Sequence, residues 1–307
     1  MAAGTSTVRL EQGGGMALEP LRTVAILGVG LIGGSIGMEL RSRGMTGEVV
    51  GIGRDRNSLD LAVGRGVIDW ATTDLREGVR SANVVVICTP VNRIVEDVRR
   101  VAEFAGPDVL VTDAGSSKKQ IVEGVEKHGR SAEVFVGAHP IAGSERTGVA
   151  NARVGLFEGR PCVLTPTSRT PSDRLDRAGR FWSSIGCRVV EMGPTEHDEV
   201  LAFTSHLPHA VAAAVASAVP VEWLPLAAGA YRDVTRVAAA DTSLWTAIFR
   251  ENRGPMLKAL DSIRDRLASF QYALMTDDEE AIRRWWDEGR RRRASFEMPD
   301  SGTHSPH

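Results

Sequence analysis

Three glycines with the spacing G-x-G-x-x-G are the residues whose pattern points most directly to chemistry: Gly28, Gly30 and Gly33. They follow an apolar run of strand type that ends at Leu27, and they precede a helical pattern. In that context the first glycine permits a tight turn, the second lets a pyrophosphate approach the backbone, and the third lets the helix pack closely on the strand. The amides of Leu31 and Ile32, at the helix start, would face the phosphates. The segment predicts a dinucleotide site, and a flexible turn without a ligand is the weaker alternative.

The adenosine end of such a site is read about 20 residues further on, where a carboxylate normally holds the ribose hydroxyls of NAD. Here the second predicted strand ends in Gly53-Arg54-Asp55. Gly53 replaces the expected acid, and Arg54 offers a guanidinium that can pair with a 2′-phosphate. Asp55 could still fold back on the ribose, and Arg54 could equally be a solvated turn residue. We predict NAD or NADP as the cofactor, with a slight preference for NADP or relaxed use.

Three further segments reach the carboxyl ends of predicted strands, which is the edge where open parallel sheets bind ligands. Thr89 and Pro90 form a loop that can pass beneath a nicotinamide ribose, and Ser116 lies in a turn of small residues. His139 lies on the third loop, and an ordinary histidine pKa of about 6.5 suits proton abstraction near neutral pH. Ser116 could orient this imidazole or bridge it to the cofactor. The simpler alternatives are a turn-capping histidine and a helix-capping serine.

A second group of polar residues lies beyond residue 193, in the segments Ser205–Ala210, Tyr231–Arg236 and Asp241–Trp245. His206 and His209 are three residues apart, but no third ligand or cysteine pair accompanies them, which disfavours a metal site. They are either core or interface histidines or polar groups aimed at a substrate. Asp233 and Arg236 on one helical face form either a simple ion pair or a unit in which Asp233 positions Arg236 to clamp a carboxylate.

The order of the predicted strands and helices indicates the fold that positions these residues. From Leu21 to about Met192, short strands rich in Val and Ile alternate with amphipathic helices, which predicts a Rossmann-type, doubly wound parallel sheet. The expected strands are 23–27, 48–52, 83–88, 108–112, 134–136, 161–164 and 187–190. Only helical patterns follow. We therefore predict an α/β dinucleotide-binding domain at 21–193 and an all-α substrate domain at 194–297, flanked by a flexible leader at 1–20 and a disordered tail at 298–307.

Composition limits the partners of the 307-residue chain. A net charge of −2 without a basic excess gives no support for a nucleic-acid partner. The apolar stretches fall short of the roughly 20 residues that a membrane span needs, and the N-terminal segment does not have the pattern of a signal peptide. Cys88, Cys162 and Cys187 are far apart, which favours buried thiols in a reducing cytoplasm. We expect a cytoplasmic protein with a small-molecule substrate.

Taken together, the motifs resemble one family, prephenate dehydrogenase and its arogenate-using relatives in tyrosine biosynthesis. The resemblance runs in unbroken order from about Leu21 to Phe296. The matching segments after the glycine loop are Thr112–Lys118, His139–Glu145, Ser205–Ala210, Asp233–Arg236 and Asp241–Trp245. His-Pro-Ile-Ala-Gly and Ser-His-Leu-Pro-His-Ala are specific to the family, whereas the glycine loop alone is not.

The resemblance implies a homodimer whose helical domains interlock, with each active site in a cleft between domains. It implies that His139 accepts the proton of the substrate's ring hydroxyl, and that Ser116 hydrogen-bonds this histidine and helps to place the nicotinamide. As substrate-binding residues it implies Ser144, Glu145, Ser205, His209, Asp233, Arg236 and Trp245. Within that set Arg236 would hold a carboxylate, Glu145 and Asp233 would tune the polar network, and Trp245 would line the pocket, either from the same subunit or from the other one.

The implied reaction is an oxidative decarboxylation: hydride passes to NAD(P)+, CO2 leaves, and the ring becomes aromatic. Three alternatives stay open. The first is oxidation of arogenate instead of prephenate. A β-hydroxyacid dehydrogenase would use a lysine of the helical domain, but Lys258 is the single lysine there and nothing around it resembles such a site. A non-catalytic NAD(P)-binding regulator would have a degraded site, yet His139, Ser116, His209 and Arg236 are all present.

Overall fold

The structure, a computed structural model, describes residues 9–10, 21–143 and 146–296. The chain divides into two compact units, residues 1–253 and 254–307. The predicted Rossmann-type sheet is confirmed in the first unit, where six parallel strands lie in the order β4-β3-β2-β5-β6-β7. Their bounds are β2 Leu21–Leu27, β3 Thr46–Ile52, β4 Trp70–Thr72, β5 Val84–Ile87, β6 Leu110–Asp113 and β7 Phe135–Val136. The order reverses between β2 and β5, and open α/β sheets bind ligands at such a switch point.

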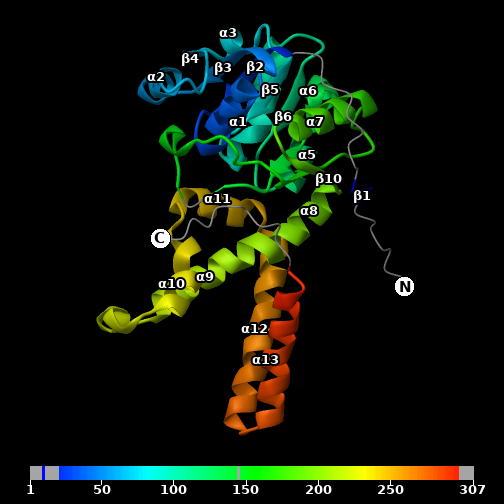
Figure 1. The fold of residues 1–307 in the computed structure, drawn as a ribbon. Helices are drawn as coiled ribbons and strands as arrows, with labels where there is room; N and C mark the ends of the chain where they lie inside the picture. Colours follow the sequence, from blue (N-terminus) through cyan, green and yellow to red (C-terminus); the bar gives the residue numbers. More distant parts are fainter. Residues whose placement is uncertain (1–8, 11–20, 144–145, 297–307) are drawn as a thin grey trace. The chain divides into compact units, whose positions relative to one another are not determined.

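Different helices cover the two faces of this sheet, because alternate strand residues point to opposite sides. Along β2, Val24 and Ile26 enter one apolar cluster and Ala25 enters the other. The helices are α1 Leu31–Ser42, α2 Arg56–Gly64, α3 Leu75–Val79, α4 Ile94–Phe104, α5 Lys119–Val125, α6 Gly129–Val134 and α7 Ser172–Ser184. Side chains of α1 and α7 complete the first cluster, and those of α3, α4 and α5 complete the second (Figure 1).

The last two predicted strands do not extend the parallel sheet. β9 (Pro161–Leu164) and β10 (Arg188–Glu191) join β8 (Ala138–Pro140) and β1 (Arg9–Leu10) in a second sheet of order β1-β10-β9-β8. β8 pairs antiparallel with β9, and it begins only one residue after β7, too soon for the long crossover that a further parallel strand requires. The chain therefore changes sheets at Gly137, where a Cβ would lie 2.5 Å from Thr165 Oγ1.

Two residues of the predicted leader, and none of the predicted tail, are among the described residues. Arg9–Leu10, inside the segment expected to be flexible, forms strand β1 and pairs antiparallel with β10. The rest of residues 1–20 and the tail at 298–307 lie outside the described residues. The domain boundary at residue 193 stays a prediction.

The chain beyond β10 is helical throughout its described part. Its elements in the first unit are α8 Pro194–Leu201, η3 Ala202–His206, α9 Leu207–Ala218, η4 Val221–Leu226, α10 Gly229–Thr235, η5 Arg236–Ala239 and α11 Thr242–Glu251. η3 is a π-helical turn that ends two residues before Pro208. Proline lacks an N–H and crowds the preceding carbonyls, and a π-helical turn accommodates both effects.

The stretch from α8 to α9 is more apolar than expected. By length and composition alone, this 25-residue helical stretch, with an 18-residue window of mean hydropathy 1.3, would suffice to cross a membrane. The expectation of only short apolar stretches was therefore wrong for this segment. The buried polar residues His197, Asp198 and His206 lie on α8 and η3 and pack within the first unit, whereas α9 buries only Ala212.

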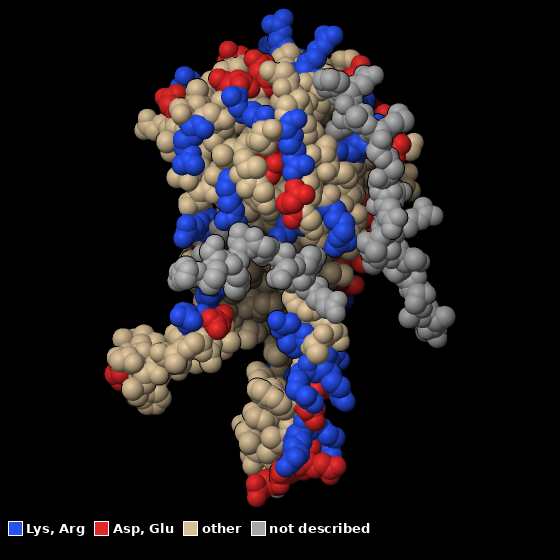
Figure 2. Space-filling model, in the orientation of Figure 1, with Lys and Arg blue, Asp and Glu red and all other residues tan. Residues whose placement is uncertain are grey.

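The second unit contains α12 (Arg253–Met275) and α13 (Glu279–Ala294), which form a helical hairpin. The rings of Phe270 and Trp285 stack at 4.5 Å, and Trp285 Nε1 donates to the carbonyl of Arg266 at 3.1 Å. Along α13, Arg and Glu side chains pair at helical spacing, including Arg283–Glu279 and Arg292–Glu288 (Figure 2). The arginine-rich end is thus a solvated helix with internal ion pairs.

Candidate active site

The glycine loop has the geometry that its spacing predicts. Gly28 has φ +98°, and a Cβ there would lie 2.8 Å from the carbonyl oxygen of Cys88. A Cβ at Gly33 would collide with the carbonyl of Gly28 and the side chain of Ile26, so the close packing of helix on strand needs this glycine. Gly30 faces open space and caps α1 without a side-chain hydrogen bond. The amides that begin α1 are therefore accessible to an anion.

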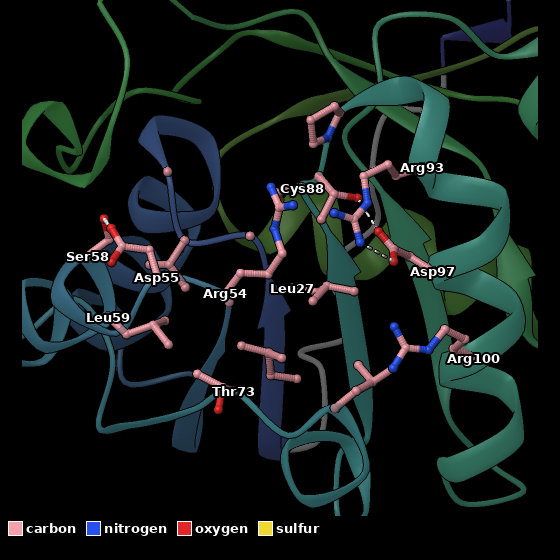
Figure 3. Close-up of a pocket in the computed structure, with 18 residues that line it drawn as sticks. Leu27, Arg54, Asp55, Ser58, Leu59, Thr73, Cys88, Arg93, Asp97 and Arg100 are labelled. Carbon is pink, nitrogen blue, oxygen red and sulfur yellow. Dashed lines mark hydrogen bonds and ion pairs between the residues drawn. The ribbon is translucent and has the colours of Figure 1, made fainter.

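A pocket of about 710 Å³ extends from this loop (Figure 3). Its lining includes Gly28, Gly30, Arg54, Thr89 and Pro90, which are five of the predicted cofactor-binding residues. The pocket lies at the switch point of the sheet, between the ends of β2, β3 and β5. Its volume and position fit the adenosine and pyrophosphate of a dinucleotide.

At the adenosine end of the pocket, the carboxylate of Asp55 caps α2 by accepting from the amide of Asn57 at 3.1 Å and from Ser58 Oγ at 2.6 Å. Asp55 also lines the pocket, so both Asp55 and Arg54 border the space predicted for the adenosine ribose. The hydrogen bond from Ser58 lowers the pKa of Asp55. The Arg54 side chain lies in the pocket, and its guanidinium has no ion-pair partner among the described residues (Figure 3).

The opposite wall is built by the loop after β5 and by α4. Thr89 Oγ1 donates to Asp97 Oδ2 at 2.6 Å, and Arg93 lies 3.7 Å from the same carboxylate. Pro90 begins the short helix η1 (Val91–Arg93). Thr89 is thus fixed by Asp97, which leaves its backbone and that of Pro90 to shape the pocket.

His139 lies on β8 and is nearly buried, with 9% of its surface exposed. Its Nδ1 lies 2.9 Å from Nε2 of His197, a residue of α8 that is fully buried. Nδ1 of His197 in turn lies 2.8 Å from Oδ1 of Asp198. The carboxylate of Asp198 accepts the backbone amides of Lys118 and Lys119 at 2.7 and 3.0 Å. His139 is therefore the end of a chain of hydrogen bonds that begins at Asp198.

A buried ion pair holds the backbone beside His139. Lys118 and Asp113 have fully buried side chains and form an ion pair with each other. Lys118 Nζ also donates to the carbonyl of Ala138 at 2.9 Å, and Asp113 Oδ1 accepts the amide of Ala138 at 2.9 Å. Both polar groups of the residue preceding His139 are thus fixed by charged side chains. Because neither side chain reaches solvent, we interpret this ion pair as structural.

The burial of His139 governs its protonation. Desolvation lowers its pKa well below the ordinary value, and the charges of His197, Lys118 and His206 act in the same direction. The pKa of His197 is also lowered, again chiefly by burial. Both imidazoles are therefore neutral near physiological pH, and a neutral imidazole is the form that can accept a proton.

The predicted partner of His139 differs from the observed one. The Ser116 side chain makes no hydrogen bond to His139 in the described part of the chain, and the position at Nδ1 is taken by His197. Ser117 Oγ, next in sequence, is buried without a hydrogen-bond partner among the described residues. Any bond from Ser116 must therefore form at the other ring nitrogen, Nε2.

The helical segment continues the polar network. The amide nitrogen of Asn252 donates to the carbonyl of Asp198 at 2.8 Å and lies 3.0 Å from Nδ1 of His206. Burial lowers the pKa of His206 to about 4. Because His206 is buried and bonded to Asn252, it is a core histidine, which decides between the two interpretations of this position.

His209 contacts Trp245 and lies near Arg236. The Trp245 ring stacks on His209 with ring centres 3.7 Å apart, and it meets His206 edge-on at 5.9 Å. His209 Nδ1 lies 2.9 Å from the carbonyl of Ser205, so the predicted Ser205 contributes its backbone here. Burial lowers the pKa of His209, and the nearby charge of Arg236 lowers it further. Trp245 is therefore next to His209 within one chain.

The structure adds little on the remaining predicted substrate-binding residues, Asp233, Ser144 and Glu145. Asp233 is exposed and forms an ion pair with Arg232, Oδ1 to Nε, at 3.5 Å. Ser144 and Glu145 lie outside the described residues. His197, Asp198, Asn252 and the Asp113–Lys118 pair were not predicted as site residues. The first two lie in the polar run Thr195–Glu199 at the start of the helical pattern, and such a run is also typical of a solvated helix start.

A glycine loop, an open pocket beyond it and a neutral histidine just after the last strand of the parallel sheet together indicate a dinucleotide-dependent dehydrogenase. The family model of the prephenate dehydrogenase nucleotide-binding domain matches residues 36–191. That of the prephenate dehydrogenase dimerization domain matches residues 193–288. The chain belongs to the prephenate dehydrogenase family.

Individual relatives agree with this assignment. Prephenate dehydrogenase from Bacillus subtilis is 31% identical over 271 residues, which cover 86% of this chain and 73% of that protein. Cyclohexadienyl dehydrogenase from Zymomonas mobilis is 30% identical over 282 residues, 89% of this chain and 95% of that protein. The crystal structure of prephenate dehydrogenase from A. aeolicus with hydroxyphenyl propionate and NAD+ matches with a TM-score of 0.84 at 33% identity, and covers 90% of this chain and 98% of that chain.

Proposed function

We propose that this chain oxidises and decarboxylates prephenate to 4-hydroxyphenylpyruvate, with His139 as the base. The observation that carries the proposal is the state of His139. It is neutral and its Nδ1 is occupied by His197, so Nε2 remains as the nitrogen that can accept a proton. The family of the chain supplies the substrate class, and the bound cofactor would supply the hydride acceptor.

His139 has a part in both halves of this reaction. When hydride leaves the ring carbon that bears the hydroxyl, Nε2 of His139 takes the hydroxyl proton and that carbon becomes a ketone carbonyl. Loss of the ring carboxylate as CO2 then moves the electron pair onto the ketone oxygen and makes a phenolate. The imidazolium returns its proton to that oxygen, so His139 ends neutral and no proton is lost or gained overall. One buried base therefore serves both steps.

Substrate binding is assigned to the helical segment. Prephenate carries two carboxylates, and Arg236 offers a planar guanidinium that can bind one of them with two hydrogen bonds. His209, stacked on Trp245 and close to Arg236, is placed to hold a second polar group of the substrate. Ser144, Glu145 and Asp233 keep the roles that the family resemblance implies for them, and Ser116 keeps the role of helping to place the nicotinamide.

The cofactor proposal follows from the residues at the adenosine end of the pocket, Gly53, Arg54 and Asp55. Gly53 offers no carboxylate to the ribose, and Asp55 is bound to α2. Arg54 is a guanidinium in the pocket without an ion-pair partner among the described residues. These observations support binding of a 2′-phosphate, and we therefore assign NADP+ as an accepted cofactor alongside NAD+.

A homodimer through the helical segment completes the proposal. Val221, Trp223 and Leu226 on η4 are 77%, 60% and 87% exposed. Large apolar side chains clustered on a surface are typical of an interface between proteins. The match of residues 193–288 to a dimerization domain supports a second copy of this chain as the partner. Cytoplasmic localisation remains an expectation.

Initial rates with prephenate and arogenate, each against NAD+ and NADP+, test the function directly. We expect turnover with prephenate and with both cofactors. Because one relative is a cyclohexadienyl dehydrogenase, turnover of both substrates would assign the broader specificity. Turnover of arogenate alone would replace the proposed substrate, and binding of cofactor without turnover of either would favour a non-catalytic regulator.

A further inference from the structure

The chain of hydrogen bonds behind His139 has a direction. Asp198, at one end, already accepts two backbone amides, and an ionised carboxylate has no proton to donate. Nδ1 of His197, which faces Asp198, must therefore carry a hydrogen. A neutral imidazole carries one hydrogen, so Nε2 of His197 is left as an acceptor. The only hydrogen available for the bond between the two rings is then on Nδ1 of His139.

We propose that His197 and Asp198 are positioning residues that hold His139 in the Nδ1–H tautomer and so make Nε2 the basic nitrogen. This inference rests on the proposed function, because it explains how the base of that reaction is prepared. Free histidine prefers the opposite tautomer, with the hydrogen on Nε2, and in that form the nitrogen facing the substrate could not accept a proton. The Asp198–His197 pair reverses the preference through two hydrogen bonds.

The surroundings give this arrangement the rigidity that it needs. Asp198 is bound by the first amides of α5 and, through its own carbonyl, by Asn252. His197 is fully buried on α8, and the peptide before His139 is fixed by Asp113 and Lys118. His139 therefore belongs to the sheet edge, whereas the residues that set its tautomer belong to the first helix after β10. The helical segment thus prepares the base as well as binding the substrate.

The pair also has a role after proton transfer. Once Nε2 has taken the substrate's proton, Nδ1–H of the imidazolium continues to donate to His197, and Asp198 lies behind it as the balancing negative charge. The other charged or titratable groups around the two rings are Asp113, Lys118 and His206. Of these only Asp113 is negative, and it is already paired with Lys118. Asp198 is therefore the group best placed to stabilise the charged intermediate.

Nitrogen NMR of the full-length protein labelled with 15N-histidine tests the tautomer without any variant. The signals of His139 are identified by their loss in His139→Asn. We expect a protonated Nδ1 and an unprotonated Nε2 in the wild-type protein at neutral pH. A wild-type His139 that carries its hydrogen on Nε2 would overturn the inference.

Two variants of equal side-chain length test the consequence for turnover. His197→Gln keeps an acceptor oxygen within reach of His139, whereas His197→Met has none. We expect kcat to fall on the order of 100-fold in His197→Met and much less in His197→Gln, with cofactor affinity unchanged in both. In His197→Met the tautomer of His139 should also change to Nε2–H.

These outcomes separate the inference from the function on which it rests. Equal losses of kcat in both variants, with the tautomer of His139 unchanged, would show that His197 has a merely structural role. Near-normal activity of His139→Asn would instead remove the base from the proposed function, whatever tautomer the wild-type protein shows.

Discussion

The two halves of the site, the cofactor pocket and the environment of His139, are built by opposite means. The pocket depends on backbone and on missing side chains: Gly28 turns, Gly33 lets α1 pack, and Gly30 leaves open space. The environment of His139 depends on side chains that are charged or polar and almost completely buried. The glycine loop is made from neighbours in sequence, whereas the environment of His139 is made from segments brought together by the fold.

This difference has an energetic consequence. Gly30 and Arg54 line the open pocket, so substitutions at these two positions should change cofactor affinity. Buried ionic and polar groups are costly unless every member is paired, so substitutions there should change stability and rate together. Substitutions in the cofactor pocket and substitutions around His139 should therefore differ in their effects on affinity, stability and rate.

The largest effect should come from the base itself. His139→Asn removes the proton acceptor, and we expect kcat to fall about 1000-fold with cofactor affinity unchanged. Initial rates with prephenate and a fluorescence titration with reduced cofactor measure the two quantities. A variant that loses cofactor binding to the same degree would show that the two halves of the site are not independent.

The next largest effect should appear in stability. Lys118→Met leaves Asp113 as a buried charge without its partner, and we expect the free energy of unfolding to fall by about 3–5 kcal/mol. Lys119→Met, at the adjacent exposed position, is the matched control and should change it by less than about 0.5 kcal/mol. Urea denaturation of both variants makes the comparison, and equal effects would contradict a special role for the buried pair.

The pH dependence of stability gives a smaller effect. The pKa of His206 is about 4 in the folded protein, against about 6.5 in an unfolded chain. Between these values the unfolded state binds a proton that the folded state does not, so this contribution is complete above pH 6.5 and is lost as the pH falls toward 4.

Replacing the histidine should remove that contribution. Between about pH 7 and about pH 5, we expect His206→Phe to lose about 2 kcal/mol less unfolding free energy than the wild type. His128→Phe, at an exposed position, is the control and should retain the wild-type dependence. If His206→Phe also retained it, the histidine would not be neutral in the fold.

The smallest effect is expected at the cofactor pocket. Arg54→Gln should raise KM for NADP+ about tenfold, because it removes one charged hydrogen-bonding group, while KM for NAD+ should stay the same. Arg56→Gln changes a neighbouring arginine that pairs with Asp60 on the surface, and it should affect neither value. An equal rise in KM for both cofactors would place Arg54 at the shared pyrophosphate rather than at the 2′-phosphate.

The same contrast explains what could be predicted from the sequence. The glycine loop and the parallel strands were predictable because their signals are local, and His139 was found because its loop follows a strand. The second sheet was missed because the change at Gly137 occurs within one residue and leaves no turn pattern. The short strands β4 and β8 were missed for the same reason, since three residues show no periodicity.

The network behind His139 was not predictable from spacing. His197 is 58 residues from His139, and Asn252 is 54 residues from Asp198. Contacts over such separations are decided by how α8 and α11 pack, and a single sequence contains no pattern that reports this. Asp55 shows a local contact that was not predicted, because its carboxylate caps α2 while the residue also lines the cofactor pocket.

The two hydrogen bonds at Ala138 have a consequence for motion. Its amide and carbonyl are held by Asp113 and Lys118, whose side chains are fully buried. Opening the backbone here would break two hydrogen bonds to a buried ion pair, so we expect the amide hydrogen of Ala138 to exchange with solvent only when the surrounding structure unfolds. The backbone next to the base would then stay in place during turnover, and the movement that admits the substrate and releases the product would take place elsewhere in the protein.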